Sequence, residues 1–164
     1  MAGPDMRSVM RDINTIQLGL TITPLTEAPD VSGVNRVYKY WPSSAHSISA
    51  ADTPCFINEW TTPRISFLPS MMRTEAIVHM QLLYFNGDND VAADVVTAFL
   101  PKIAEAFAGN IKLKADVAVN IGALRGRNPT LALLSFAGMD FVGLDFDLDL
   151  HFTDEQVNSP GTAP

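Results

Sequence analysis

The sequence is poor in cysteine and in charge. Charged residues make up 18% of the 164 residues, and Cys55 is the single cysteine. One cysteine excludes an internal disulfide and a cysteine-rich zinc site, and its apolar surroundings favour a buried, inert thiol. Lys and Arg number only 11 against 18 Asp and Glu, which gives a net charge of -7. That balance argues against a protein that holds DNA by neutralising its phosphates.

Long hydrophobic runs are also missing. No stretch approaches the roughly 20 apolar residues that a membrane-spanning helix requires, and residues 1–12 lack the apolar core of a secretory signal. Hydrophobic residues nevertheless make up 47% of the chain. The combination predicts a folded protein that is made in a reducing cytoplasm and has no membrane contact. The low charged fraction predicts that part of its surface is hidden between subunits.

The short motifs that mark common catalytic sites do not occur. The sequence contains no Gly-x-Ser-x-Gly nucleophile turn, no Gly-x-x-x-x-Gly-Lys phosphate loop and no His-Glu-x-x-His zinc motif. Its three histidines fall on different predicted elements, and no two have the spacing of metal ligands on one helix. We therefore expect no enzymatic activity, no metal site and no cofactor.

Hydrophobic periodicity predicts helices and strands in a defined order. We expect helices over residues 5–20 and 88–107, and strands over residues 34–41, 55–60, 73–85, 117–121, 131–136 and 139–152. Residues 43–53 are expected to form a surface loop, and residues 61–72 a loop or an excursion at a sheet edge.

This order favours an α+β domain, in which two helices pack on one face of a mainly antiparallel sheet. The domain is expected to span residues 5–153. A short tail at residues 1–4 precedes it, and an extended polar tail at residues 154–164 follows it.

The strand predicted at residues 139–152 carries the sharpest local pattern. Its apolar residues share one face, whereas Asp145, Asp147 and Asp149 share the other. Side chains two residues apart on a strand lie about 6.5–7 Å apart on the same face, so these like charges repel one another. Three interpretations are open: a solvated face, a metal site completed by His151, and a surface selected for negative potential. A straight strand alone cannot supply the six or more oxygens that Ca²⁺ prefers, which disfavours the metal site.

The strand predicted at residues 73–85 has one apolar face and one mixed face, on which apolar and polar residues occur together. On the mixed face Ile77, Leu83 and Phe85 stand among polar residues. Large apolar side chains on a second face indicate that something packs over it. We interpret these three residues as candidate contacts with a neighbouring subunit.

The only compact basic spot is formed by Arg125 and Arg127, in a segment rich in Gly and Pro. Two arginines cannot hold DNA against a net charge of -7, but they can pair with carboxylates in bidentate geometry. A solvated loop and an inter-subunit contact are both consistent with this spot.

Three segments together resemble the tail terminator (tail completion) proteins of long-tailed bacteriophages. Residues 136–150 (FAGMDFVGLDFDLDL) are similar to the closing hairpin of that family, in which aromatic residues and glycines precede an alternating acidic and apolar strand. Residues 75–85, the turn 86–89 and the helix through Phe107 resemble its central strand and helix. Residues 34–42 resemble its first strand, which follows an N-terminal helix.

The resemblance implies a structural virion protein that assembles into a ring-shaped homo-hexamer. In the family, the ring caps the tube of major tail protein at its head-proximal end and stops its polymerisation. It also presents a surface to the head-tail connector or stopper protein, and DNA passes through the lumen without specific binding. The resemblance therefore implies a place in the neck of the virion, after assembly in the host cytoplasm.

On this basis Asp145, Asp147 and Asp149 are candidates for an acidic, lumen-facing surface. Like charge repels DNA over about one Debye length, ~8 Å at physiological salt. Two other functions stay open. One is another virion component, such as a head completion protein, a head-tail joining protein or a tube-like subunit. The other is a metal-dependent enzyme that uses these aspartates with His151.

Overall fold

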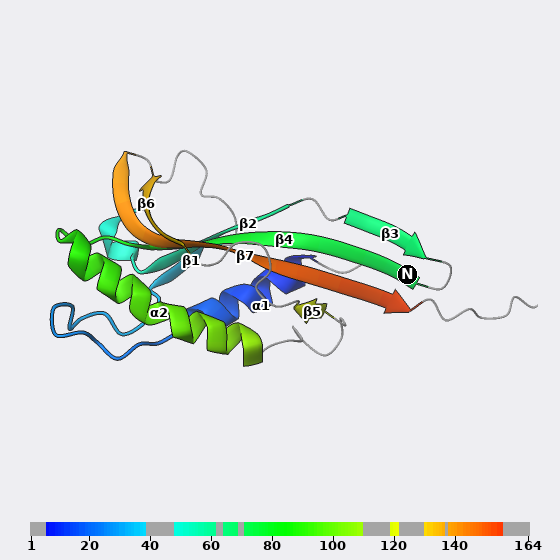
Figure 1. Ribbon diagram of the computed structural model, residues 1–164, viewed down its shortest axis with the longest axis horizontal. Coiled ribbons are helices and arrows are strands. Elements are labelled where there is room, and N and C mark those ends of the chain that lie inside the picture. Colours follow the sequence, from blue (N-terminus) through cyan, green and yellow to red (C-terminus); the bar gives the residue numbers. More distant parts are fainter. Residues whose placement is uncertain are drawn as a thin grey trace, which may run out of the picture.

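A computed structural model of the chain describes residues 6–38, 48–61, 64–68, 71–109, 119–121, 130–136 and 138–155 (Figure 1). The segment 122–129 with Arg125 and Arg127, the tail 1–4 and most of the predicted tail 154–164 lie outside the described residues. The elements are α1 (Met6–Leu18), β1 (Arg36–Tyr38), the 3-10 helix η1 (Ala50–Asp52), β2 (Cys55–Trp60), β3 (Arg64–Leu68), β4 (Met71–Tyr84), α2 (Asn89–Gly109), β5 (Val119–Ile121), β6 (Thr130–Phe136) and β7 (Met139–Glu155).

All seven strands belong to one mixed sheet, whose main order is β1-β2-β4-β7-β5. β3 continues the line of β2 along one edge of β4, and β6 occupies the opposite edge of the sheet beside β7. β1 and β2 run parallel, and the other pairings are antiparallel. The predicted α+β class with a mainly antiparallel sheet is thus confirmed.

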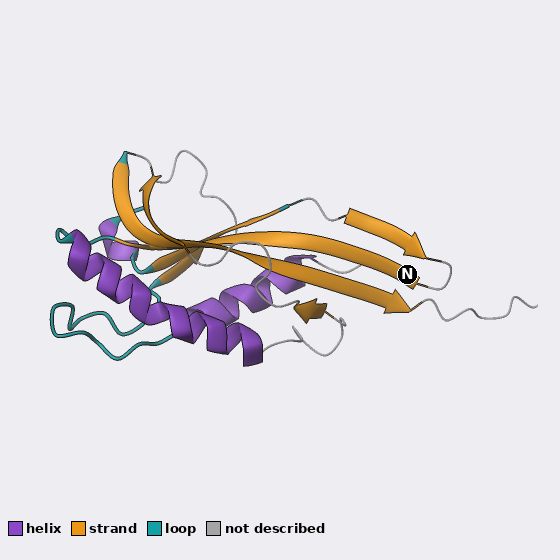
Figure 2. Cartoon of the chain, viewed as in Figure 1, coloured by secondary structure: helices purple, strands orange, loops and turns teal. Residues whose placement is uncertain are grey.

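Both helices cover the same face of this sheet (Figure 2). Alternate residues of β4 and β7 point toward them, because side chains along a strand alternate between the two faces. The resulting core is largely apolar, and its largest hydrophobic members include Met10, Ile13, Phe56, Met80, Leu82, Phe99, Ile103 and Phe146. The amphipathic pattern of the sequence therefore places the two helices correctly.

Helix α2 begins where the sequence predicts. The carboxylate of Asp88 accepts hydrogen bonds from the backbone N–H groups of Asp90, at 2.8 Å, and Val91, at 3.4 Å. These bonds satisfy two of the donors that a helix start leaves unpaired. The helix then continues through Pro101 to its end at Gly109.

The closing hairpin is also confirmed. β6 and β7 pair from Phe136 opposite Met139 to Thr130 opposite Asp145. Gly138 in the turn has φ of 84°, a conformation that residues with a Cβ rarely adopt. β7 then continues beyond the predicted end at Phe152 and reaches Glu155.

Two regions depart from the prediction in detail. Residues 64–68, expected in a loop or edge excursion, form a regular edge strand, because β3 finds its hydrogen-bonding partners on the distal end of β4. The first strand is shorter than expected, since Arg36–Tyr38 alone of its described residues pair with β2. Beyond the part covered by the helices, β3, β4 and β7 project as a ribbon (Figure 1).

Candidate interaction face of the sheet

The face of the sheet that points away from the helices is the candidate functional site, and we call it the open face. The register of β2, β4 and β7 brings the alternate residues of these strands together on it. Its charged and polar members are Glu59 on β2, Glu75, His79 and Gln81 on β4, and Asp145, Asp147 and Asp149 on β7.

His79 lies between two of the three predicted aspartates. Its Nδ1 atom is 2.6 Å from Asp147 Oδ1, and its Nε2 atom is 3.0 Å from Asp145 Oδ1. The Nδ1 contact is a hydrogen bond with Asp147, whereas the Nε2 contact brings the ring within ion-pair distance of Asp145. His79 of β4 therefore lies against two of the three aspartates of β7.

These three side chains are largely covered. The exposed fraction is 24% for His79, 20% for Asp145 and 19% for Asp147. A freely solvated acidic face does not describe Asp145 and Asp147, since both are half-buried and lie against His79 of the neighbouring strand. The side chain of His151 lies outside the described residues, and the part of the chain that the structure describes contains no group of three or more side chains arranged to hold a metal ion.

The three apolar residues predicted on this side have different surroundings. Ile77 and Phe85 are exposed, and the Phe85 ring packs edge-on against Phe141 with the ring centroids 6.2 Å apart. Leu83, in contrast, is fully buried inside the subunit. It belongs to a second small core with Ile48, Cys55, Ile57 and Phe141. Ile77 and Phe85 thus expose apolar surface, whereas Leu83 stabilises the subunit itself.

Cys55 lies in this second core as an unpaired, buried thiol. Burial raises the pKa of its thiol to about 12, because the thiolate would lose its hydration there. The expected inert character of this cysteine has a direct physical cause.

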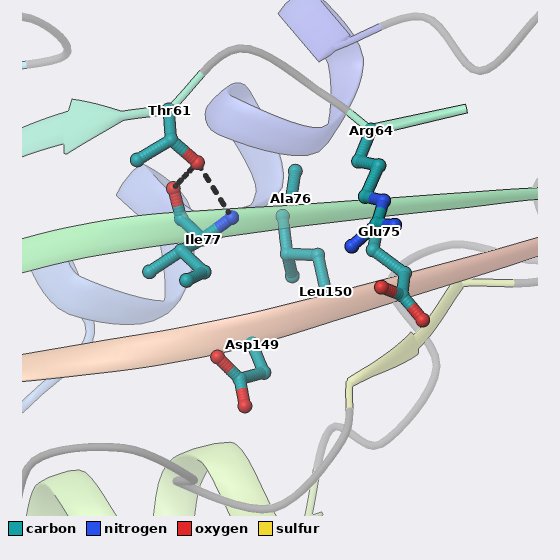
Figure 3. A pocket seen from close by; sticks show the side chains of 7 residues that line it. All are labelled: Thr61, Arg64, Glu75, Ala76, Ile77, Asp149 and Leu150. Carbon is teal, nitrogen blue, oxygen red and sulfur yellow. Dashed lines mark hydrogen bonds between the residues drawn. The ribbon is translucent and has the colours of Figure 1, made fainter. Parts of the chain in front are cut away.

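A cleft of about 320 Å³ opens where β2 ends and β3 begins (Figure 3). Thr61 lies at the rim of the cleft and is fixed there by two hydrogen bonds to β4. Its N–H donates to Ile77 O at 2.8 Å, and its Oγ1 accepts from Ile77 N at 3.1 Å. The lining side chains combine charge, hydroxyl and apolar surface: Thr61, Arg64, Glu75, Ala76, Ile77, Asp149 and Leu150.

Comparison with protein-family models gives no match for the chain, and no curated protein matches it. Among the described helices, none is both long and apolar enough to cross a membrane. Membership of the tail terminator family is therefore a proposal, which depends on the resemblance of the three sequence segments.

Sequence reasoning missed the role of His79. It placed this residue on the mixed face of its strand, but the contact with Asp147 depends on which residues of β4 and β7 stand opposite each other. The isolated alternation of each strand carries no information on that register. The one available signal was a histidine on the mixed face of one strand and a row of aspartates on the polar face of another.

Proposed function

We propose that this protein is a tail terminator of a long-tailed bacteriophage, a structural subunit with no enzymatic role. Six copies form a ring at the head-proximal end of the tail tube, where the ring stops polymerisation and provides the surface for head attachment. Its partners are further copies of this chain, the major tail tube protein and the head-tail connector or stopper protein. DNA passes through the ring without specific binding.

The observation that carries this proposal is the closing hairpin with its acidic open face. The resembling segment 136–150 runs from the end of β6 into β7, and β7 presents Asp145, Asp147 and Asp149 away from the helices. Glu59 and Glu75 stand on the same face. An acidic surface of this kind lets a polyanion pass, because it does not bind phosphate groups.

The distribution of apolar residues supports assembly. The described part of the chain exposes several large hydrophobic side chains. In addition, only 18% of the residues in the sequence are charged. The exposed hydrophobic side chains stand on the open face and on strands at both edges of the sheet, among them Ile65, Ile77, Phe85, Leu131 and Leu133. Burying them between subunits would remove their contact with water and offset the repulsion between subunits of charge -7.

The proposal is tested by mass and shape. Native mass spectrometry of the purified chain is expected to give about 107 kDa, six times the 17.8 kDa of one subunit. Electron microscopy is expected to give ring-shaped class averages with an open lumen. Purified rings added to polymerising tail tube protein from the same genome should cap one tube end and limit tube length. A chain that stays monomeric in every one of these experiments contradicts the proposal.

A further inference from the structure

The outer strand β6 has an edge that is open toward a partner. Within the described part of the sheet, β6 pairs only with β7. Its sequence, TLALLSF, contains no charged residue and no proline. Proteins usually protect such an edge with lysine, proline or a bulge, because an unprotected edge pairs with other strands. This edge lacks those charged residues and prolines.

β6 also exposes two leucines. Leu131 is 48% exposed and Leu133 is 59% exposed, whereas the alternate residues of the strand turn inward. Leu131 stands opposite Leu144 and Leu133 opposite Val142, so both leucines lie on the helix side of the sheet but beyond the helices' cover. The edge therefore offers apolar side chains together with backbone hydrogen-bonding groups.

A matching edge exists at the other side of the same sheet. β3, with the sequence RISFL, pairs with β4 alone among the described strands. Ile65 on β3 is 54% exposed and stands opposite Thr74, which puts it on the helix side of the sheet as well. β3 and β6 thus present apolar residues of the same face at opposite edges of the sheet.

We propose that β6 of one copy pairs with β3 of the next copy, so that the sheet continues from subunit to subunit. Strand direction favours this pairing. β3 is antiparallel to β4, β4 to β7 and β7 to β6, so β3 and β6 of two copies in the same orientation meet antiparallel. Ile65 of one copy and the leucines of the other then lie on one face of the joint, as cross-strand neighbours that exclude water.

Because the two edges are different, the contact is head-to-tail. A copy that has paired through its β3 edge can still bind a further copy through its β6 edge. β6 lies beside residues 139–145 of β7, whereas β3 lies at the level of residues 151–155. Successive copies are therefore displaced by about 36 Å along the strands, at about 3.3 Å per residue. A stagger of this kind is what allows a sheet to close on itself. This inference rests on the proposed homo-oligomer and specifies its interface.

Three lysine variants with equal change of charge test the pairing. Leu133→Lys blocks the β6 edge and Ile65→Lys blocks the β3 edge. Leu18→Lys is the matched control, because Leu18 on α1 is 52% exposed but lies on a helix and on neither edge strand. All three positions are exposed, so circular dichroism and the melting temperature should stay close to those of the unchanged chain.

We expect Leu18→Lys to keep the mass of the unchanged assembly, and each edge variant alone to fall to the mass of one subunit. A 1:1 mixture of Leu133→Lys and Ile65→Lys should form dimers and nothing larger, since only one intact β6 edge and one intact β3 edge can meet. An assembly that survives Leu133→Lys or Ile65→Lys, or a mixture that yields no dimer, overturns the inference but leaves the proposed ring standing. An unchanged chain that is always monomeric overturns both.

Discussion

Gln17 of α1 and Asn58 of β2 exchange two hydrogen bonds inside the core. Gln17 Nε2 donates to Asn58 Oδ1, and Asn58 Nδ2 donates to Gln17 Oε1, each at 2.8 Å. Both residues are fully buried, and Gln17 also contacts the sulfur of Met80. This reciprocal amide pair fixes the position of α1 on the sheet, because neither amide finds another equally good set of partners in an apolar core.

Replacing both members of this pair should cost less than the sum of the two single replacements. Asn58→Leu leaves the Gln17 amide buried without its main partner, at an expected cost of about 1–3 kcal/mol in the free energy of unfolding. In the double variant Gln17→Leu and Asn58→Leu, no buried amide lacks a partner, so its cost should be smaller than the sum of the single substitutions. Urea unfolding of the unchanged chain, both single leucine variants and the double variant measures the coupling, and additive costs would contradict the role of the pair.

The contacts of His79 with Asp147 and Asp145 should be visible as energetic coupling between β4 and β7. His79→Leu removes the hydrogen-bonding partner of Asp147 and the ring beside Asp145, and we expect a loss of about 1–3 kcal/mol in the free energy of unfolding. The same substitution should cost less in a chain that carries Asp145→Asn and Asp147→Asn. As control, Asp149→Asn should combine additively with His79→Leu, since Asp149 stands opposite Ile77. Equal coupling for all three aspartates would disprove the role of these contacts.

Gly143 of β7 allows a close approach between three strands. A Cβ at this position would lie 2.6 Å from Leu82 O and 2.7 Å from Leu134 Cδ1. Gly143→Ala must therefore push the backbone of β4 away and move the Leu134 side chain, and we expect a loss of about 1–3 kcal/mol in stability. Gly87→Ala is the control, because nothing lies within 4 Å of a Cβ there. Similar melting temperatures for the two variants would show that the sheet absorbs the extra methyl group.

Asp52 should make the first strand sensitive to acid. Burial opposes the ionisation of its carboxyl, but hydrogen bonds from Arg36, the backbone of Ser49 and Tyr38 outweigh that cost and lower its pKa below the ordinary value of 3.8. A lowered pKa in the folded state stabilises the protein at neutral pH, and this contribution is lost as the pH falls through the folded value. The stability difference between the unchanged chain and Asp52→Asn should be constant above about pH 5 and shrink below about pH 4. A difference that does not change with pH would refute the pairing.

Cys55 should react with thiol reagents only after unfolding. Its pKa of about 12 leaves almost no thiolate at about pH 8, and its side chain is fully buried. The labelling rate with an aromatic disulfide is therefore expected to follow the unfolded fraction as urea is added. Labelling of the folded chain at the rate of a free thiol would contradict the placement of this residue.

The elements that the sequence predicted well are those with strong local patterns. The spaced apolar residues of α2, the capping Asp88 and the alternation of β7 each depend on a few neighbouring residues. The second helix and the closing hairpin were therefore placed nearly residue by residue.

The contacts between distant segments could not be predicted in the same way. The parallel pairing of β1 with β2, the Gln17 amide pair and the approach of His79 to Asp147 all depend on which strand lies beside which, and in which register. Leu83 is an example. The alternation of residues along its strand assigns it to the mixed face, but it is a core residue because the hairpin of β6 and β7 packs against it. Tertiary packing, and not local preference, decides such positions.

The pairing of β4 with β7 also determines the order of folding. All 14 residues of β4 find their partners on a strand from which they are separated in the chain by α2, β5 and β6. Joining such distant segments costs loop entropy before any contact is gained, so the central ladder should form slowly and late. Until β7 leaves the ribosome, the edge of β4 opposite β2 has no strand to pair with. Folding of the sheet is therefore expected to finish after β7 has been synthesised, and a chain cut before that strand should aggregate.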